Sequence, residues 1–565
     1  MKLKSILLAG FAMLTVAGSL YAQAENDKLL TILKEELAQQ MKELQKEEFP
    51  PYHMNYRVID KNVFQVSSSF GALMGTAKSH TVRLVPQVRV GSYEFDNFKN
   101  RHMGASQNRQ TGAMSSASLP LNIEGSENAV RQAIWNETNN RYKFALSVFR
   151  NDLANRSVNV ASDDKAPSFS DAEVEKYYEA PLAAEKLQLN MEEWGEKLNK
   201  ISAVFNKSKK ILQGNASLTY TIERRYFVDT DGREVVQNLS YARSMVNAQT
   251  KADDGMVLPL YLSYFAFEPK DLPAMDKILA DANALADKVL ELRDAPIVDP
   301  YTGPAILSGA ASGVFFHEIF GHRIEGQRMK SDRDGQTFKK LVGQFVLPAT
   351  MNVYDDPTIK TFNGEELNGY YKFDDQGIRA QRVHAVKDGK LEGFLMTRTP
   401  IDNFPRSNGH ARATDGFDAV SRQSNLVIES SENLTEEDLR RMLIEEVKKQ
   451  GKEYGFYFKE VTGGLTFTGV GQTNSFSVNP IEVYKVFVDG RPDQLVRGVD
   501  LIGTPLSMFS NIIHAGGNSQ VFTGMCGAES GSIPVTAISP TILVNKVEMQ
   551  RKAKSQELPP ILERP

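Results

Sequence analysis

The segment 304–322, PAILSGAASGVFFHEIFGH, restricts the fold and chemistry of this chain more than any other stretch. A short apolar run, a small-residue turn and a second apolar run predict a strand, a turn and then an apolar helix. His317, Glu318 and His322 lie toward the end of that helix. Histidines and a carboxylate grouped on a helix are typical of zinc hydrolases, so the segment is a candidate metal site.

The spacing of the two histidines differs by one residue from the usual zinc-hydrolase pattern. In His-Glu-x-x-His they are four residues apart and share one helical face. His322 instead follows His317 by five residues, and on a regular helix their directions would differ by about 140°. A π-bulge, or a helix broken at Gly321, would bring them together. In a regular helix, one histidine would be exposed at the helix end and the other buried in the core.

A catalytic zinc site needs three protein ligands and an open position, so a third ligand must come from elsewhere. The candidates are His384, His410, His514, Glu325 and Cys526. Cys526 is the single cysteine, and the surrounding sequence GMCG predicts a tight loop. A thiolate is a soft ligand well suited to zinc, although a lone cysteine can also be buried and inert. For Glu325 we favour a supporting role over ligation.

Composition and the N-terminus predict an exported globular protein. The 565 residues are 41% hydrophobic and 24% charged with a net charge of −4, which gives no reason to expect nucleic acid as a partner. Residues 1–24 contain two lysines, an apolar run and an Ala-x-Ala ending, which predict a secretory signal peptide. A membrane anchor is the alternative, but the run is short and broken by glycine. We expect a periplasmic or secreted bacterial protein without stable membrane insertion.

The length implies more than one domain, and the pattern predicts an α+β fold. Helical patterns cover the segments 27–49, 127–156, 191–211, 271–295 and 435–455. Between the early helices lie Val- and Tyr-rich strands, with a hairpin at Asp-Thr-Asp-Gly, 229–232. We predict an N-terminal α+β domain over residues 25–296. A strand-rich C-terminal catalytic domain containing the motif helix follows over residues 297–565.

Six blocks after residue 297 occur in one order. They are GPAILSGAASGVFFHEIFGHRIEG, YDDPTI, FDDQGIRAQRVHAVKDGKLEGFL, FYFKEVTGGLTF, VRGVDLIGTPL and GMCGAESGSIPVTAISPTILV. Together they resemble the TldD/PmbA family of metallopeptidases, its TldD-like branch in particular. The His-Glu-x-x-x-His and Gly-x-Cys-Gly blocks are the most specific, whereas the N-terminal half resembles the family only in general character.

The resemblance implies a zinc site built from His317, His322 and Cys526, with one Zn²⁺ per chain. It implies that Glu318 is the general base, which takes a proton from zinc-bound water and passes it to the leaving amine. The expected substrates are unfolded or extended peptides, bound through main-chain hydrogen bonds as an added strand. The expected assembly is a homodimer, or a heterodimer with a related family member.

Four further residues are candidates for contacts to substrate. His410 or Arg412, in the polar segment SNGHARATDG, could stabilise the oxyanion of the transition state. Gly463 and Gly464, in VTGGLTF, could let a peptide backbone approach closely. The simpler interpretation is a solvent-facing loop for the first pair and a turn for the second.

The signal peptide separates this chain from the family, which is mostly cytosolic, so we expect different substrates and partners. Two other functions fit the same residues. One is a non-catalytic partner or scaffold with a structural zinc, and the other is a metal-dependent amidase acting on cell-wall or other non-protein amides. Glu318 distinguishes the scaffold from the enzymes, because a structural site has no use for a carboxylate beside its first histidine.

Overall fold

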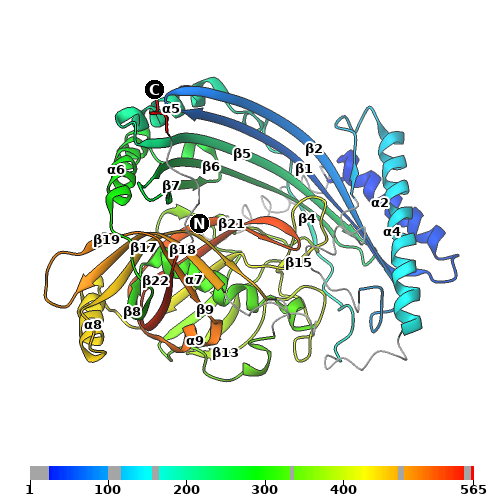
Figure 1. Ribbon diagram of the computed structural model, residues 1–565. Helices are drawn as coiled ribbons and strands as arrows, with labels where there is room; N and C mark the ends of the chain where they lie inside the picture. Colours follow the sequence, from blue (N-terminus) through cyan, green and yellow to red (C-terminus); the bar gives the residue numbers. More distant parts are fainter. Residues whose placement is uncertain (1–23, 99–115, 156–164, 331–335, 469–475, 553–560) are drawn as a thin grey trace, which may run out of the picture.

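The computed structural model describes two large, mostly antiparallel β-sheets with helices packed against them (Figure 1). The described residues are 24–98, 116–155, 165–330, 336–468, 476–552 and 561–565. The α+β prediction is confirmed. The predicted signal peptide lies outside the described residues except for Ala24. Within the described ranges, no helix has both the length and the apolar content that crossing a bilayer requires.

The N-terminal sheet is built from long strands. They are β1 (Pro51–Ser69), β2 (Ala72–Val90), β3 (Ala117–Ser118), β4 (Lys176–Tyr178), β5 (Ile211–Asp229), β6 (Glu234–Lys251) and β7 (Val257–Ala266). Their order is β3-β2-β1-β5-β6-β4, and β7 also pairs with β6. β5 and β6 form the hairpin that the sequence predicts, and Gly232 supplies its positive φ of 97°.

Helices cover this sheet near its two ends and give it two separate apolar cores. α2 (Lys28–Leu44) and α4 (Glu127–Asn155) pack at one end, and α5 (Met191–Ala203) and α6 (Met275–Asp294) at the other (Figure 1). The short 3₁₀ helices are η1 (Ala184–Leu187), η2 (Val204–Lys207) and η3 (Pro269–Asp271). α5 ends earlier than predicted, because the chain tightens into η2 before β5 begins.

The C-terminal half forms the second large sheet and several short pairs. Its strands are β8 (Tyr301–Leu307), β9 (Met351–Asp355), β10 (Thr361–Phe362), β11 (Glu365–Glu366), β12 (Val383–Lys387), β13 (Lys390–Leu391), β14 (Ala411–Arg412), β15 (Val420–Ser421), β16 (Asn425–Ser430), β17 (Tyr454–Thr466), β18 (Phe476–Phe487), β19 (Gln494–Val496), β20 (Val499–Gly503), β21 (Ile512–Ala528) and β22 (Gly531–Arg551). Its helices are α7 (Gly309–Ile319), α8 (Glu436–Lys449), α9 (Pro505–Ser510), η4 (Gly321–Arg323), η5 (Gly326–Lys330) and η6 (Lys339–Leu341).

Five strands of this sheet close on themselves around an apolar core. The sheet order contains β22-β20-β18-β17-β8, and β22 also pairs with β8. α7 packs against β17, β21 and β22 and is buried along almost its whole length. A helix that is apolar on all sides is stable only in such a core. The predicted strand, turn and apolar helix are therefore confirmed as β8, Ser308 and α7.

The chain passes from one sheet to the other between α6 and β8, and the predicted boundary at residue 296 falls in this connection. The N-terminal sheet arches over the C-terminal half (Figure 1). A cavity of about 1330 Å³ lies between them, lined by β6 and β7 on one side and by α7, β17 and β21 on the other. The histidine motif at the end of α7 lies in this cleft.

Candidate metal centre

The two motif histidines meet because α7 ends between them. The α-helix stops at Ile319, Phe320 leaves helical geometry with φ −120° and ψ −54°, and the 3₁₀ turn η4 follows. The ring centroids of His317 and His322 are 4.9 Å apart. The predicted irregularity at Gly321 is thus confirmed, and it is a break rather than a π-bulge.

Gly321 is required at the break by close packing. A Cβ atom at this position would lie 1.8 Å from Oε1 of Gln423. The side-chain amide of Gln423 also donates to the carbonyl oxygen of His317 at 3.4 Å. A larger residue at 321 would therefore displace the side chain that covers the end of α7.

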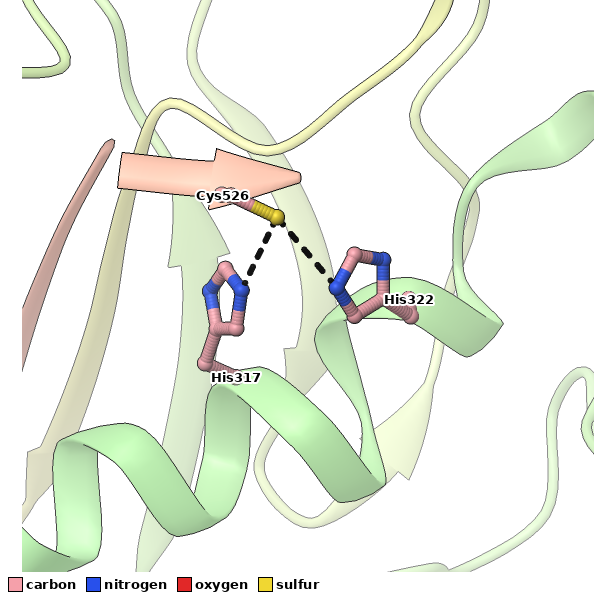
Figure 2. A group of neighbouring side chains, drawn as sticks. All are labelled: His317, His322 and Cys526. Atoms are coloured by element: carbon pink, nitrogen blue, oxygen red, sulfur yellow. Dashed lines mark hydrogen bonds between the residues drawn. The ribbon is translucent and has the colours of Figure 1, made fainter. Parts of the chain in front are cut away.

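Cys526 lies opposite both histidines (Figure 2). Its Sγ is 3.2 Å from Nε2 of His317 and 3.3 Å from Nε2 of His322. The prediction of a tight loop around Cys526 is wrong, because the residue belongs to β21 and pairs with Ile533 of β22. The turn of this hairpin comes later, at residues 529–530, so the glycines beside Cys526 lie within a regular antiparallel ladder.

The three donor atoms fit a zinc ion. They lie within 4.8 Å of one another. Tetrahedral zinc, with bonds of about 2.0 Å to nitrogen and 2.3 Å to sulfur, sets the nitrogen–sulfur distance near 3.5 Å. The observed distances of 3.2 and 3.3 Å reach this value with shifts of a few tenths of an ångström. Two imidazoles and a thiolate leave one position of a tetrahedral ion open.

Arg422 makes Cys526 a strong ligand. Its Nη2 lies 3.1 Å from Sγ and donates to the carbonyl oxygen of Cys526 at 2.7 Å. Burial raises the pKa of the thiol, but His322, His317 and Arg422 outweigh it and lower this pKa well below its usual value. The lowered pKa favours the thiolate, the form that binds metals.

Glu325 supports His322 from the side opposite Cys526. It is fully buried; one of its carboxylate oxygens lies 3.2 Å from His322 Nδ1 and accepts from Arg328 Nε at 2.9 Å. Burial raises the pKa of Glu325, but His322 and Arg328 outweigh it and lower this pKa to about 2. A carboxylate behind a histidine fixes the ring and directs Nε2 toward the metal. The preference for a supporting role over ligation is thus consistent with its contacts.

Glu318 provides a carboxyl group next to the three donor atoms, and Gly464 packs against its side chain. Both line the cleft, and a Cβ on residue 464 would lie 2.4 Å from Cγ of Glu318. Burial is the main cause of the raised pKa of the Glu318 carboxyl. Among the described residues, this carboxylate has no hydrogen-bond partner. A desolvated carboxylate beside a metal site is able to accept and release a proton.

The other residues predicted to contact substrate divide into two pairs. Gly463 and Gly464 line the cleft, on an irregular part of β17. His410 and Arg412 do not line it. Nε2 of His410 faces Asp355 at 3.2 Å, and Arg412 is buried with its guanidinium donating to a backbone carbonyl. The polar segment around them is not a solvent-facing loop, because β14 pairs with β15 in the interior.

The remaining candidates for a third ligand lie elsewhere. His384 is exposed on β12 beside Tyr354, and His514 contacts Glu432 at 3.1 Å. Sequence reasoning missed Arg422 and Arg328. Each is an arginine in an ordinary polar segment, so no local spacing could have revealed its contacts with the site.

The C-terminal half can be compared with known proteins. Residues 300–551 match the PmbA/TldA metallopeptidase C-terminal domain. The C-terminal half therefore resembles the TldD/PmbA family in sequence. A relative from Archaeoglobus fulgidus, named a metalloprotease, is 28% identical over 238 residues, which cover 42% of this chain and 51% of that protein. A Haemophilus influenzae protein, named a metalloprotease TldD homolog, is 24% identical over 248 residues, covering 43% and 47%.

The chain therefore spans about half the length of these curated relatives. The likeness of fold extends further. The crystal structure of TldE from Thermococcus kodakarensis superposes with a TM-score of 0.59 and covers 92% of this chain and 100% of that one, at 12% sequence identity. At this identity the likeness concerns the fold, including the arched N-terminal sheet.

Proposed function

We propose that this protein is a zinc-dependent peptidase that hydrolyses peptide bonds in unfolded or extended peptides. The observation that carries the proposal is the position of Glu318. Its unpaired carboxylate lies beside three convergent metal-binding side chains, in a cleft of about 1330 Å³. A structural zinc site is normally closed by four protein ligands and needs no free carboxylate. Relatives of the C-terminal half are named metalloproteases, which supports the same conclusion.

The chain's own residues would divide the reaction between them. His317, His322 and Cys526 would hold the zinc ion, which supplies a Lewis acid that polarises the substrate carbonyl and acidifies water. Glu318 would accept a proton at its carboxylate and deliver it to the leaving amine. Arg323 holds this end of α7 in place, because its Nη1 donates to the carbonyl oxygen of Glu318 at 2.7 Å and to Thr466 Oγ1 at 2.8 Å.

The preference for extended peptides is supported by the edge of β21. Within the described residues, the strand partner of β21 is β22, and Gly516 also forms an isolated bridge with Leu434. The outer edge of the part that lines the cleft has no strand partner among these residues. An extended peptide can add to such an edge through main-chain hydrogen bonds, which impose little side-chain preference. The two glycines of β17 leave room for a backbone on the opposite wall of the cleft.

Glu318→Gln tests the reaction directly. We expect the variant to keep its zinc and to cleave an unstructured peptide pool at least about 100-fold more slowly, because the general base is lost. Zinc is measured by elemental analysis and cleavage by mass spectrometry. Glu436→Gln, the same change at an exposed position of α8, is the matched control. If zinc-loaded wild type cleaves nothing that Glu318→Gln leaves intact, the peptidase proposal fails and the structural-zinc scaffold replaces it.

The proposal also covers the cellular location of the protein and its oligomeric state. On the pattern of residues 1–24 we propose export to the periplasm or the exterior, with cleavage after Ala24. We also propose a homodimer, or a heterodimer with a related chain, because the fold is shared with a protein named TldE. N-terminal sequencing of the protein recovered from cell fractions tests the first proposal, and a retained Met1 would reject it. Light scattering tests the second, and a monomeric mass for every preparation would reject it.

A further inference from the structure

Arg243 brings an unneutralised positive charge from the N-terminal sheet into the cleft. It lies on β6, on the same face as Met245 and Asn247, which also line the cleft. Its Nε donates to Ser263 Oγ at 3.1 Å, and its Nη2 lies 3.4 Å from the carbonyl oxygen of Thr523. Among the described residues, no Asp or Glu carboxylate lies within 4.0 Å of its guanidinium. Arg243 is half-buried. Charges that are removed from water in proteins are normally paired, so this arrangement requires an explanation.

The other cations of the cleft have their partners. Arg328 pairs with both Glu325 and Glu529, at 2.8 and 2.9 Å. The two motif histidines face the Cys526 thiolate. Of the charged side chains that line the cleft within the described ranges, only Arg243 and Glu318 have no oppositely charged group within 4.0 Å. Glu318 is needed for the reaction, which leaves Arg243 available to the substrate.

The state of the guanidinium agrees with this interpretation. Burial lowers the pKa of Arg243, and no carboxylate compensates for it. The group nevertheless stays protonated, because an arginine side chain is not deprotonated in proteins. A guanidinium has five N–H donors, and the contacts with Ser263 and Thr523 leave the majority of them for another acceptor. A carboxylate accepts two parallel hydrogen bonds from such a group.

The position of Arg243 relates it to the metal centre. Its contact residue Thr523 precedes Cys526 by three residues on β21, which is about 10 Å along an extended strand. We propose that Arg243 binds a carboxylate of the substrate peptide, about three residues from the bond that is cleaved. This inference rests on the proposed peptidase function and names its substrate class. The N-terminal sheet would thereby select acidic or C-terminal segments of peptides.

A set of four matched peptides tests the proposal and separates the two sources of a carboxylate. They share one sequence, with Glu or Gln three residues from the cleaved bond and a free or amidated C-terminus. For Arg243→Gln we expect KM to rise about 10- to 100-fold for peptides with the recognised carboxylate, with kcat and the neutral peptide little changed. A KM effect that depends on Glu or Gln identifies a side-chain carboxylate, and one that depends on a free or amidated end identifies the C-terminal carboxylate. Arg83→Gln, the same change on β2 away from the cleft, is the control.

Binding measurements keep this test independent of catalysis. The same four peptides, labelled for fluorescence anisotropy, are titrated into Glu318→Gln protein with Arg243 intact or changed to Gln. If wild type cleaves nothing, the peptidase proposal fails while the binding data still decide the role of Arg243. A loss of affinity confined to carboxylate-bearing peptides supports the proposal, and partial recovery in Arg243→Lys strengthens it. An equal effect on all four peptides, or none, overturns it and reduces Arg243 to a structural contact of β21.

Discussion

At the scale of single residues, nitrogen groups surround the sulfur of Cys526 on three sides. His317, His322 and Arg422 each place a nitrogen 3.1–3.3 Å from Sγ. The arginine also binds the backbone carbonyl of Cys526, so one guanidinium fixes both the charge and the position of the ligand. A thiol whose pKa is lowered in this way gives up its proton to zinc more easily, whereas each histidine binds the ion through a neutral Nε2.

Cys526→Ser tests this ligand. We expect the zinc content to fall from about one per chain to near zero, because a neutral hydroxyl is a poor replacement for a thiolate. Elemental analysis after gel filtration measures it. Gly527→Ser is the matched control, because a Cβ at that position meets no atom within 4 Å. Equal zinc in both variants would contradict the assignment of Cys526.

The sequence could reveal only part of this residue-level arrangement. The spacing of the motif pointed to His317, Glu318 and His322, and the single cysteine drew attention to Cys526. Arg422 and Arg243 could not be found, because each reaches the site from a distant strand or loop and carries no local pattern. His410 has a polar local sequence that is typical of an exposed loop near a site. In the structure it is buried and faces Asp355 away from the cleft.

At the scale of elements, the site depends on two irregularities. α7 breaks after Ile319, and β17 loses its regular pairing with β18 between Val461 and Gly464. The sequence predicted that the helix is either widened or broken at Gly321, because two histidines five residues apart can converge only on an irregular helix. It did not predict that Cys526 lies on a strand, because the glycines beside it suggested a turn. These glycines instead take part in the regular pairing of β21 with β22.

Gly464→Ala tests the contact between these two elements. The new Cβ would lie 2.4 Å from Cγ and 2.9 Å from Oε1 of Glu318, so the carboxylate must move. We expect kcat to fall about 10- to 100-fold, because a general base displaced by about 1 Å is poorly placed. Zinc content should stay at the wild-type level. Gly527→Ala, which adds the same methyl group to an open position of the cleft, should leave kcat within about twofold. An unchanged kcat in Gly464→Ala would contradict the proposed role of Glu318.

At the scale of the whole molecule, buried ion pairs hold the N-terminal sheet over the C-terminal half. Arg57 and Arg225 of β1 and β5 pair with Asp375, at 3.4 and 3.3 Å. Arg398 of the C-terminal half also forms ion pairs with Asp229 and Asp231, at the end of β5 and just after it. The α+β class and most helices were predictable from local patterns. The arch was not, because it depends on charges more than a hundred residues apart.

Arg398→Gln tests whether these charges hold the arch. Arg398 is 1% exposed and also lies 3.2 Å from His53. Removing one member of a buried ion cluster costs about 3–5 kcal/mol at neutral pH. Arg379→Gln removes a surface pair with Glu175 between the same two halves, where the arginine is 59% exposed, and should cost under about 1 kcal/mol.

The cost of Arg398→Gln should depend on pH. Burial raises the pKa values of Asp229 and Asp231, but His53 and the arginines outweigh it and lower both below the unfolded value of about 3.9. A lowered pKa contributes stability that is present above pH 4 and is lost as the pH falls further. In thermal melts, the gap between wild type and Arg398→Gln should therefore be widest near pH 7 and shrink toward pH 3. A gap of the same size at both pH values would mean that Arg398 stabilises the arch by packing against Phe169 rather than through these carboxylates.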